Sequence, residues 1–288
     1  MPPLAIAGLL FAAALHSLWN LRAKQSRDQQ AFLLLAVIAS IVILLPFALL
    51  RWNPIPLAAW PIIGISAIFE AAYFLLLGGA YKGGDLSLVY PLSRGSSPLF
   101  VTLIATVFLR EKIALLGAVG IGLAVIGIYV IHLRSFSLDG LLEPFRALRH
   151  RTSQLALLSG FTIAGYSVSD KVGVGFVDPI VYYFITLAAS ILILSPYIWL
   201  KRRDALWAEW QLNWKSVIGA AMMIVVGYLI ILFVLMTSKV SYATSVRGAS
   251  VVFGALLGTV VLKETMGDKK VLGAVIIFAG IICIGLAN

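Results

Sequence analysis

Residues 94–111 read RGSSPLFVTLIATVFLRE, and residues 247–264 repeat this stretch as RGASVVFGALLGTVVLKE, with nine of eighteen positions identical. A second pair, DQQAFLLLAVIASIVILLPF at 28–47 and DPIVYYFITLAASILILSPY at 178–197, shares seven of twenty positions. Apolar residues coincide easily by chance, but the same polar residues and prolines in register do not. The chain is therefore predicted to consist of two related halves.

The composition identifies lipid as the solvent of this chain. Its 288 residues are 61% hydrophobic and 12% charged, whereas soluble domains carry about 25% charged residues. So little charge excludes a cytosolic enzyme, a disordered protein and a secreted disulfide scaffold, and the lone Cys283 can form no intrachain disulfide. The net charge of +10 fits basic cytoplasmic loops, and we expect no nucleic-acid partner because no segment is long enough for a soluble domain.

Ten segments reach or approach the roughly 20 apolar residues that a membrane-spanning helix needs. They are 4–22, 31–50, 60–81, 87–109, 113–133, 154–172, 179–200, 215–237, 242–262 and 270–287. Five helices per half is an odd number, so the second half enters the membrane from the opposite side. We expect an all-α integral membrane fold of ten transmembrane helices, arranged as two inverted five-helix repeats around a central cavity.

The expected domain boundaries follow from the same reading. The first repeat covers residues 1–133, a basic linker loop covers 134–153, and the second repeat covers 154–288.

Each half ends in a turn that carries a family resemblance. The turns are Leu109-Arg110-Glu111 and Leu262-Lys263-Glu264, followed by Gly117-Ala118-Val119 and Gly273-Ala274-Val275. With the five-plus-five repeat, they resemble the EamA-type branch of the drug/metabolite transporter superfamily over essentially the whole chain. The resemblance implies a secondary transporter of small metabolites, often an exporter, with a central cavity. It does not fix the substrate.

Loop charge predicts the orientation in the plasma (inner) membrane. The side that holds both termini, with loops 51–59, 110–113, 172–178 and 238–241, carries five Lys and Arg residues, and the opposite side carries fifteen. Basic loops stay in the cytoplasm, so we expect both termini outside. Many members of the resembled family are described with cytoplasmic termini, which conflicts with this prediction.

Two arginines are left inside the predicted spans, Arg94 and its counterpart Arg247. Charged groups at membrane depth are costly and usually face a cavity or a partner. The guanidinium fork matches a carboxylate or phosphate, so both residues are candidates to bind an anionic group. Ser97 and Ser250 follow within small-residue patches and are candidate ligand contacts. The competing interpretation pairs the arginines with internal carboxylates or backbone carbonyls.

Glu70 is the one clearly mid-membrane carboxylate of the sequence, and its counterpart in the second half is Val225. An asymmetric charge in a symmetric scaffold favours function. A buried carboxyl group exchanges its proton near neutral pH because loss of water disfavours its charged form. Glu70 is therefore the coupling-proton candidate, or a group that grips a substrate ammonium, or the partner of Arg94 in a structural ion pair.

Further candidates lie on predicted helices that face the cavity. His16 and Asn20 share a helix face, and their counterparts are Tyr166 and Asp170. His16, Asn20 and Tyr166 are candidate substrate contacts, and Asp170 is interpreted as interfacial. The candidate aromatic walls are Tyr73, Tyr90 and Tyr228. Glu111 and Glu264 are expected to bond the N-terminal amides of the next helix.

No enzymatic constellation accompanies these residues. The three histidines are scattered, one cysteine cannot build a zinc site, and we find no phosphate-binding loop, so we expect no metal, no cofactor and no enzyme. Gradients must then drive transport, and we expect a functional monomer. The leading hypothesis is a secondary transporter that exports an organic anion or zwitterion, such as an amino acid or another carboxylate or phosphate compound. The alternatives are a proton-coupled exporter of organic cations that uses Glu70, and a flippase of lipid-linked substrates.

Overall fold

The computed structural model describes residues 1–83, 86–131, 133, 135, 137–147, 149–262 and 267–287, and these are helical throughout apart from short connections. The first half forms α1 (Pro3–Gln25), α2 (Gln29–Leu50), α3 (Ala59–Gly83), α4 (Leu86–Phe108) and α5 (Leu115–Ile131). The second half forms α7 (Arg151–Gly173), α8 (Pro179–Lys201), α9 (Arg203–Thr237), α10 (Val240–Arg247), α11 (Ser250–Leu262) and α12 (Asp268–Leu286). The all-helical prediction is confirmed for the described residues.

Six of the described helices, α1, α2, α3, α8, α9 and α12, are long and apolar enough to cross a membrane. Their apolar side chains also point outward, as Leu4 and Leu50 do with 85% and 84% of their surface exposed. Large exposed apolar side chains on successive helices suit a lipid environment.

Aspartates cap the helices that follow the first connection of each half. Asp28 accepts the amide of Ala31 at 3.0 Å at the start of α2, and its counterpart Asp178 accepts the amide of Ile180 at 2.9 Å at the start of α8. Such a cap satisfies a backbone donor that the helix leaves unpaired. The repeated Asp therefore fixes where both helices begin.

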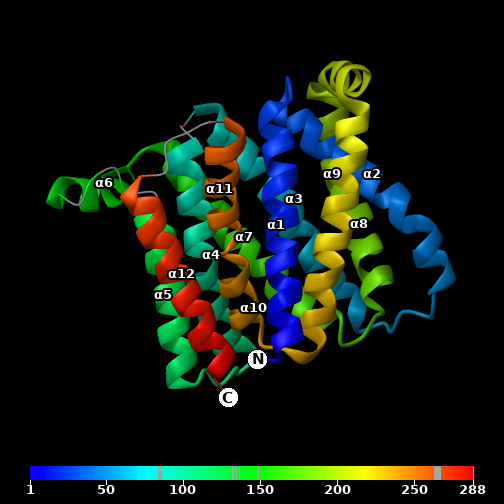
Figure 1. The fold of residues 1–288 in the computed structure, drawn as a ribbon. Coiled ribbons are helices and arrows are strands. Elements are labelled where there is room, and N and C mark those ends of the chain that lie inside the picture. The colour runs from blue at the N-terminus through cyan, green and yellow to red at the C-terminus, as the bar shows by residue number, and fades with distance from the viewer. Residues whose placement is uncertain are drawn as a thin grey trace.

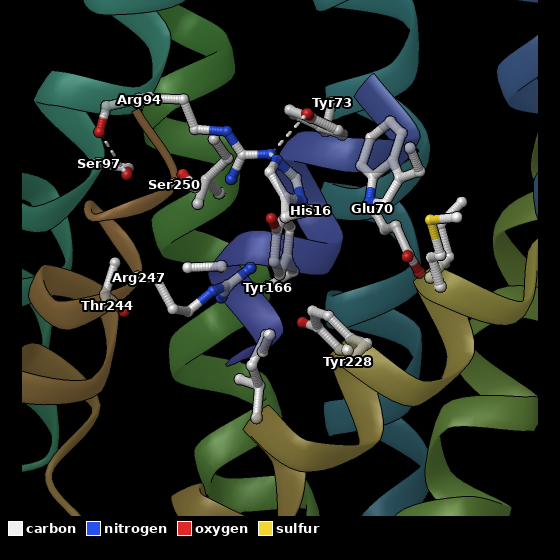
Figure 2. Close-up of a pocket in the computed structure, with 18 of the residues that line it drawn as sticks. His16, Glu70, Tyr73, Arg94, Ser97, Tyr166, Tyr228, Thr244, Arg247 and Ser250 are labelled. Carbon is white, nitrogen blue, oxygen red and sulfur yellow. Dashed lines mark hydrogen bonds between the residues drawn. The ribbon is translucent and has the colours of Figure 1, made fainter. Parts of the chain in front are cut away.

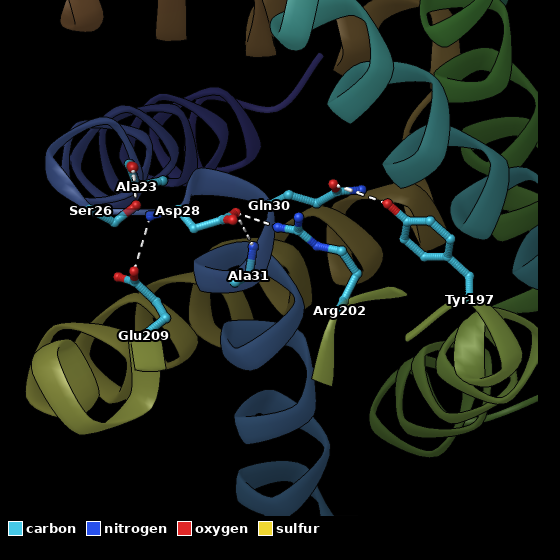
Figure 3. A network of polar contacts seen from close by, with 8 residues as sticks. All are labelled: Ala23, Ser26, Asp28, Gln30, Ala31, Tyr197, Arg202 and Glu209. Carbon is cyan, nitrogen blue, oxygen red and sulfur yellow. Dashed lines mark hydrogen bonds and ion pairs between the residues drawn. The ribbon is translucent and has the colours of Figure 1, made fainter. Parts of the chain in front are cut away.

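α2 and α8 lie together with opposite directions, and their ends are joined by ion pairs. At one end, Arg202 contacts Asp28, whose backbone amide donates to Glu209 at 3.0 Å (Figure 3). At the other end, Arg51 lies 3.6 Å from Asp178. Both termini lie together at the lower edge of Figure 1, where the amino group of Met1 donates to the carbonyl of Gly285.

Glycines set the distance between α5 and α12. A Cβ on Gly120 would lie 2.6 Å from the carbonyl oxygen of Gly280, and a Cβ on Gly127 would lie 2.7 Å from that of Gly273. The absent side chains let the two backbones approach directly, which small residues permit in membrane helices. These two helices close the bundle on the side away from α2 and α8 (Figure 1).

Three segments differ from the sequence-based expectation. The linker, expected to be a loop, contains α6 (Leu138–Ala147), and the expected loop before residue 215 belongs to α9, with a bend at Asn213. The expected span 242–262 is two helices, because α10 ends at Arg247 and α11 starts at Ser250. At this break, a Cβ on Gly248 would lie 2.9 Å from the carbonyl oxygen of Ser245 and 3.0 Å from the side chain of Ile128, so the tight passage needs glycine.

Glu111 has the capping role that the sequence predicted, but for a different helix. Its carboxylate accepts the amide of Val240 at 2.7 Å and the hydroxyl of Ser241 at 2.6 Å. These residues start α10 in the second half, whereas the expected partner was α5. Its counterpart Glu264 lies outside the described residues.

Candidate functional site

A cavity lies between the two halves, with walls from α1–α4 and α7–α11 (Figure 2). Nine of the ten candidate residues line it, namely His16, Glu70, Tyr73, Arg94, Ser97, Tyr166, Tyr228, Arg247 and Ser250. Asn20 is not among the lining residues. Its side-chain amide instead donates to the carbonyl of His16 at 2.8 Å, within α1. The prediction from the shared helix face that this amide contacts the substrate was therefore wrong.

Arg94 enters the cavity from α4 and is bound by two side chains of the same half. Its Nη2 lies 2.7 Å from Nε2 of His16 and donates to the hydroxyl of Tyr73 at 3.3 Å. The guanidinium also lies 5.9 Å from the centre of the Tyr73 ring, within range of a cation–π contact. Ser97 donates to the carbonyl of Arg94 at 3.0 Å, so its hydroxyl is used within α4.

Arg247 enters from the last residue of α10, and its surroundings differ from those of Arg94. Its guanidinium lies 5.6 Å from the centre of the Tyr228 ring, a cation–π contact between the counterparts of Arg94 and Tyr73. Among the described residues, Arg247 has no hydrogen bond and no ion pair. A cation at a helix C-terminus is favoured by the helix dipole, which helps to hold the uncompensated charge.

Glu70 lines the same cavity from α3. Its Oε2 accepts the hydroxyl of Ser190 on α8 at 2.9 Å, and Glu70 forms no ion pair with Arg94. The structural interpretation of Glu70 as the partner of Arg94 is therefore wrong. The counterpart of Ser190 is Ser40, which donates to the carbonyls of Ala36 and Ala221. Ser40 meets no carboxylate there, because the counterpart of Glu70 in the second half is Val225.

Four tyrosines form one wall of the cavity. The ring centres of Tyr73 and Tyr166 lie 6.1 Å apart, and those of Tyr166 and Tyr228 lie 6.4 Å apart. The rings of Tyr183 and Tyr228 are tilted by 31° with their centres 4.7 Å apart, within the range of favourable aromatic contacts. Tyr166 thus connects the two tyrosines that contact the arginines.

The sequence interpretation missed two hydroxyl-bearing residues of the cavity lining and misplaced one acid. Thr244 lies three residues before Arg247 on the same helix face, a spacing that could have selected it, and Tyr183 carries no such signal. Asp170 was interpreted as interfacial because Lys171 follows it. Its surface is only 2% exposed, and its carboxylate accepts the hydroxyls of Ser66 and Tyr182 at 2.6 and 2.9 Å and that of Tyr228.

Of the described residues, two with guanidinium groups and one with a carboxylate line the cavity, with aromatic surface between them. Within the part of the chain that the structure describes, no group of three His, Cys, Asp or Glu side chains is arranged to hold a metal ion. The chemistry available to the lining residues is recognition of charge and of apolar or aromatic surface.

Comparison with known proteins identifies the family and the fold. The sequence profile of the EamA-like transporter family matches residues 3–133 and again residues 151–286. No protein of curated function matches the chain. A solved structure described only as "Crystal structure of protein" is similar over 99% of this chain and 98% of its own length, with a TM-score of 0.75 and 17% sequence identity.

Proposed function

The chain belongs to the EamA-like transporter family and is an integral, multi-pass membrane protein, and from this premise we propose that it is a secondary active transporter of a small organic anion or zwitterion. The observation that carries the substrate class is the arginine pair. Arg94 and Arg247 reach one cavity from the two halves, and Arg247 has no carboxylate partner among the described residues. A bidentate carboxylate or phosphate would satisfy donors that the protein leaves open.

We propose that transport proceeds by alternating access between two inverted five-helix repeats that make ten spans. The opposite directions of α2 and α8 support this arrangement, because their ends pair as Asp28 with Arg202 and as Arg51 with Asp178. The cavity at the junction of the halves is where such transporters bind their substrates. Each half contributes one Arg–Tyr pair, so a substrate can contact equivalent groups in either state.

Glu70 is proposed as the coupling-proton site. Its carboxylate lines the cavity and bonds the neutral hydroxyl of Ser190, and no cation among the described residues pairs with it. Such a group can gain and lose a proton as the cavity opens and fills. The same position gives the second candidate function, proton-coupled export of an organic cation, in which Glu70 and the tyrosine wall bind the ammonium.

The orientation and the assembly are part of the proposal. The excess of basic loop residues opposite the termini supports termini on the outer face of the plasma (inner) membrane. Function as a monomer is proposed, because both repeats that alternating access requires lie within one chain. Export is the proposed direction.

The test is a ligand-induced melting-shift screen on the detergent-purified protein. The compounds are matched carboxylates, phosphates, amino acids and quaternary amines, each measured on the wild type and on Arg247→Gln, Arg94→Gln and Glu70→Gln. We expect anions or zwitterions to raise the melting temperature of the wild type. This shift is strongly reduced in Arg247→Gln and reduced less in Arg94→Gln.

A matched control uses an arginine outside the cavity. Arg51 is exposed at the end of α2, so Arg51→Gln retains the full anion shift. Stabilisation by amines alone, lost in Glu70→Gln and unaffected by Arg247→Gln, refutes the anion proposal and establishes the cation exporter in its place.

A further inference from the structure

A buried carboxylate lies directly behind the cavity wall, outside the lining residues. Asp170 is one helical turn beyond the lining residue Tyr166 on the same face of α7, and 2% of its surface is exposed. It accepts hydroxyl groups from three other helices, those of Ser66 on α3, Tyr182 on α8 and Tyr228 on α9. A buried carboxylate that accepts three hydrogen bonds is well compensated for its loss of water, and these bonds fix its position in the fold.

Among these donors only Tyr228 lines the cavity. Its hydroxyl is bonded to Asp170, while its ring faces the guanidinium of Arg247 at 5.6 Å. Figure 2 shows Tyr228 and Arg247 entering the cavity from neighbouring elements. Asp170 is thus connected to the candidate anion-binding group through one aromatic side chain.

The first half provides an internal comparison. There the hydroxyl of Tyr73 accepts a hydrogen bond from Arg94 at 3.3 Å, so the tyrosine occupies one of the arginine's donors. The position that corresponds to Asp170 is Asn20, whose amide is used within α1. With no acid behind it, Tyr73 turns its oxygen to the arginine. In the second half, Asp170 accepts the hydrogen bond of the Tyr228 hydroxyl, so Arg247 contacts the Tyr228 ring but not its oxygen.

We propose that Asp170 is a positioning residue of the transport site, which holds the Tyr228 ring against Arg247 and keeps the guanidinium donors of Arg247 open for the substrate anion. Asp170 bonds the hydroxyl of Tyr228 and forms no ion pair with Arg247 that would occupy those donors. The two arginines are therefore not equivalent. Arg94 is held by protein groups, and Arg247 is the primary anion contact. This inference rests on the proposed function.

The test separates the three hydroxyl bonds of Asp170. Tyr228→Phe removes one bond but keeps the ring, and Asp170→Asn keeps the shape but removes the charge. We expect each to weaken binding of the best-stabilising anion from the screen by roughly tenfold or more, because a hydrogen bond to a charged group is lost. The matched controls are Ser66→Ala and Tyr182→Phe, which remove bonds to Asp170 that lead away from the cavity. These two change the affinity less than about threefold.

A double-mutant cycle distinguishes positioning from general support of the fold. In an Arg247→Gln background, Asp170→Asn adds no further loss of affinity if it acts through Arg247. A purely structural role makes the two losses additive and makes Ser66→Ala as harmful as Tyr228→Phe, and either result overturns the inference. If Asp170→Asn does not fold, the comparison of Tyr228→Phe with Ser66→Ala decides the question.

A readout without ligand keeps the inference independent of the proposed function. Phenylglyoxal modification of Arg247, quantified on its peptide by mass spectrometry, is expected to accelerate several-fold in Tyr228→Phe and Asp170→Asn, because the ring is no longer held in a fixed position against one face of the guanidinium. Ser66→Ala is expected to leave the rate unchanged. A wild type that no anion stabilises refutes the proposed function alone. Equal modification rates in all variants refute the positioning role of Asp170.

Discussion

Alanine at Gly120 tests how the two halves are joined. A Cβ at this position would lie 2.6 Å from the carbonyl oxygen of Gly280 and 2.7 Å from Cγ1 of Ile284, both on α12. Carbon atoms in favourable contact are about 3.5–4.0 Å apart, so α5 and α12 must separate by nearly 1 Å or lose the contact. Backbone atoms cannot rotate away as the end of a flexible side chain does.

The expected cost is about 1–3 kcal/mol, the usual range for added atoms in a packed interior. At about 2–4 °C per kcal/mol, the melting temperature falls by about 2–12 °C. The matched control is Gly122→Ala on the same helix, where an added Cβ meets nothing within 4 Å. That variant is expected to be neutral or slightly more stable, because alanine favours helix over glycine.

The assay is thermal unfolding of the purified variants in one detergent, followed by intrinsic tryptophan fluorescence. Gly120→Ala is expected to unfold at a lower temperature than the wild type, and Gly122→Ala is not. If both variants unfold at the same temperature, the close packing of α5 on α12 does not hold the halves together, and this account of the glycine pairs is refuted.

Three further predictions concern charged residues. Glu70→Gln, which cannot exchange a proton, is expected to abolish transport driven by a pH gradient in proteoliposomes, and retained pH-driven transport would move the coupling site elsewhere. Glu111→Ala removes the cap of α10 and is expected to lower the free energy of unfolding by about 0.5–2 kcal/mol. Denaturant unfolding measures this loss, and an unchanged midpoint would contradict the prediction. In the pair of Arg202 and Asp28, the side chains are 12% and 34% exposed, respectively. Arg202→Ala leaves Asp28 without its cation and is expected to lower the free energy of unfolding by up to about 3–5 kcal/mol. The equivalent change at Arg51, in the exposed pair, is expected to cost about 0–1 kcal/mol, and equal losses would contradict the difference in burial.

The helical architecture was readable from the chain because its signals are local. Continuous apolar runs of membrane length predict helices wherever they occur, and the repeated Asp28 and Asp178 mark where two of them begin. The repeat also selected Arg94 and Arg247, since a charge inside an apolar run is visible without knowing its neighbours. The break after Arg247 was not readable, because it depends on how Gly248 meets the side chain of Ile128 on another helix.

The sequence by itself determined the helices, the two halves and the charged residues that reach the cavity. Only the tertiary structure decided the partners of those residues. Arg94 meets His16, 78 positions away, while Arg247 lies against the ring of Tyr228, and Asp170 is buried behind that ring instead of lying at the interface. The physical reason is that helix formation depends on residues a few positions apart, whereas the partner of a buried charge depends on which distant helices pack together.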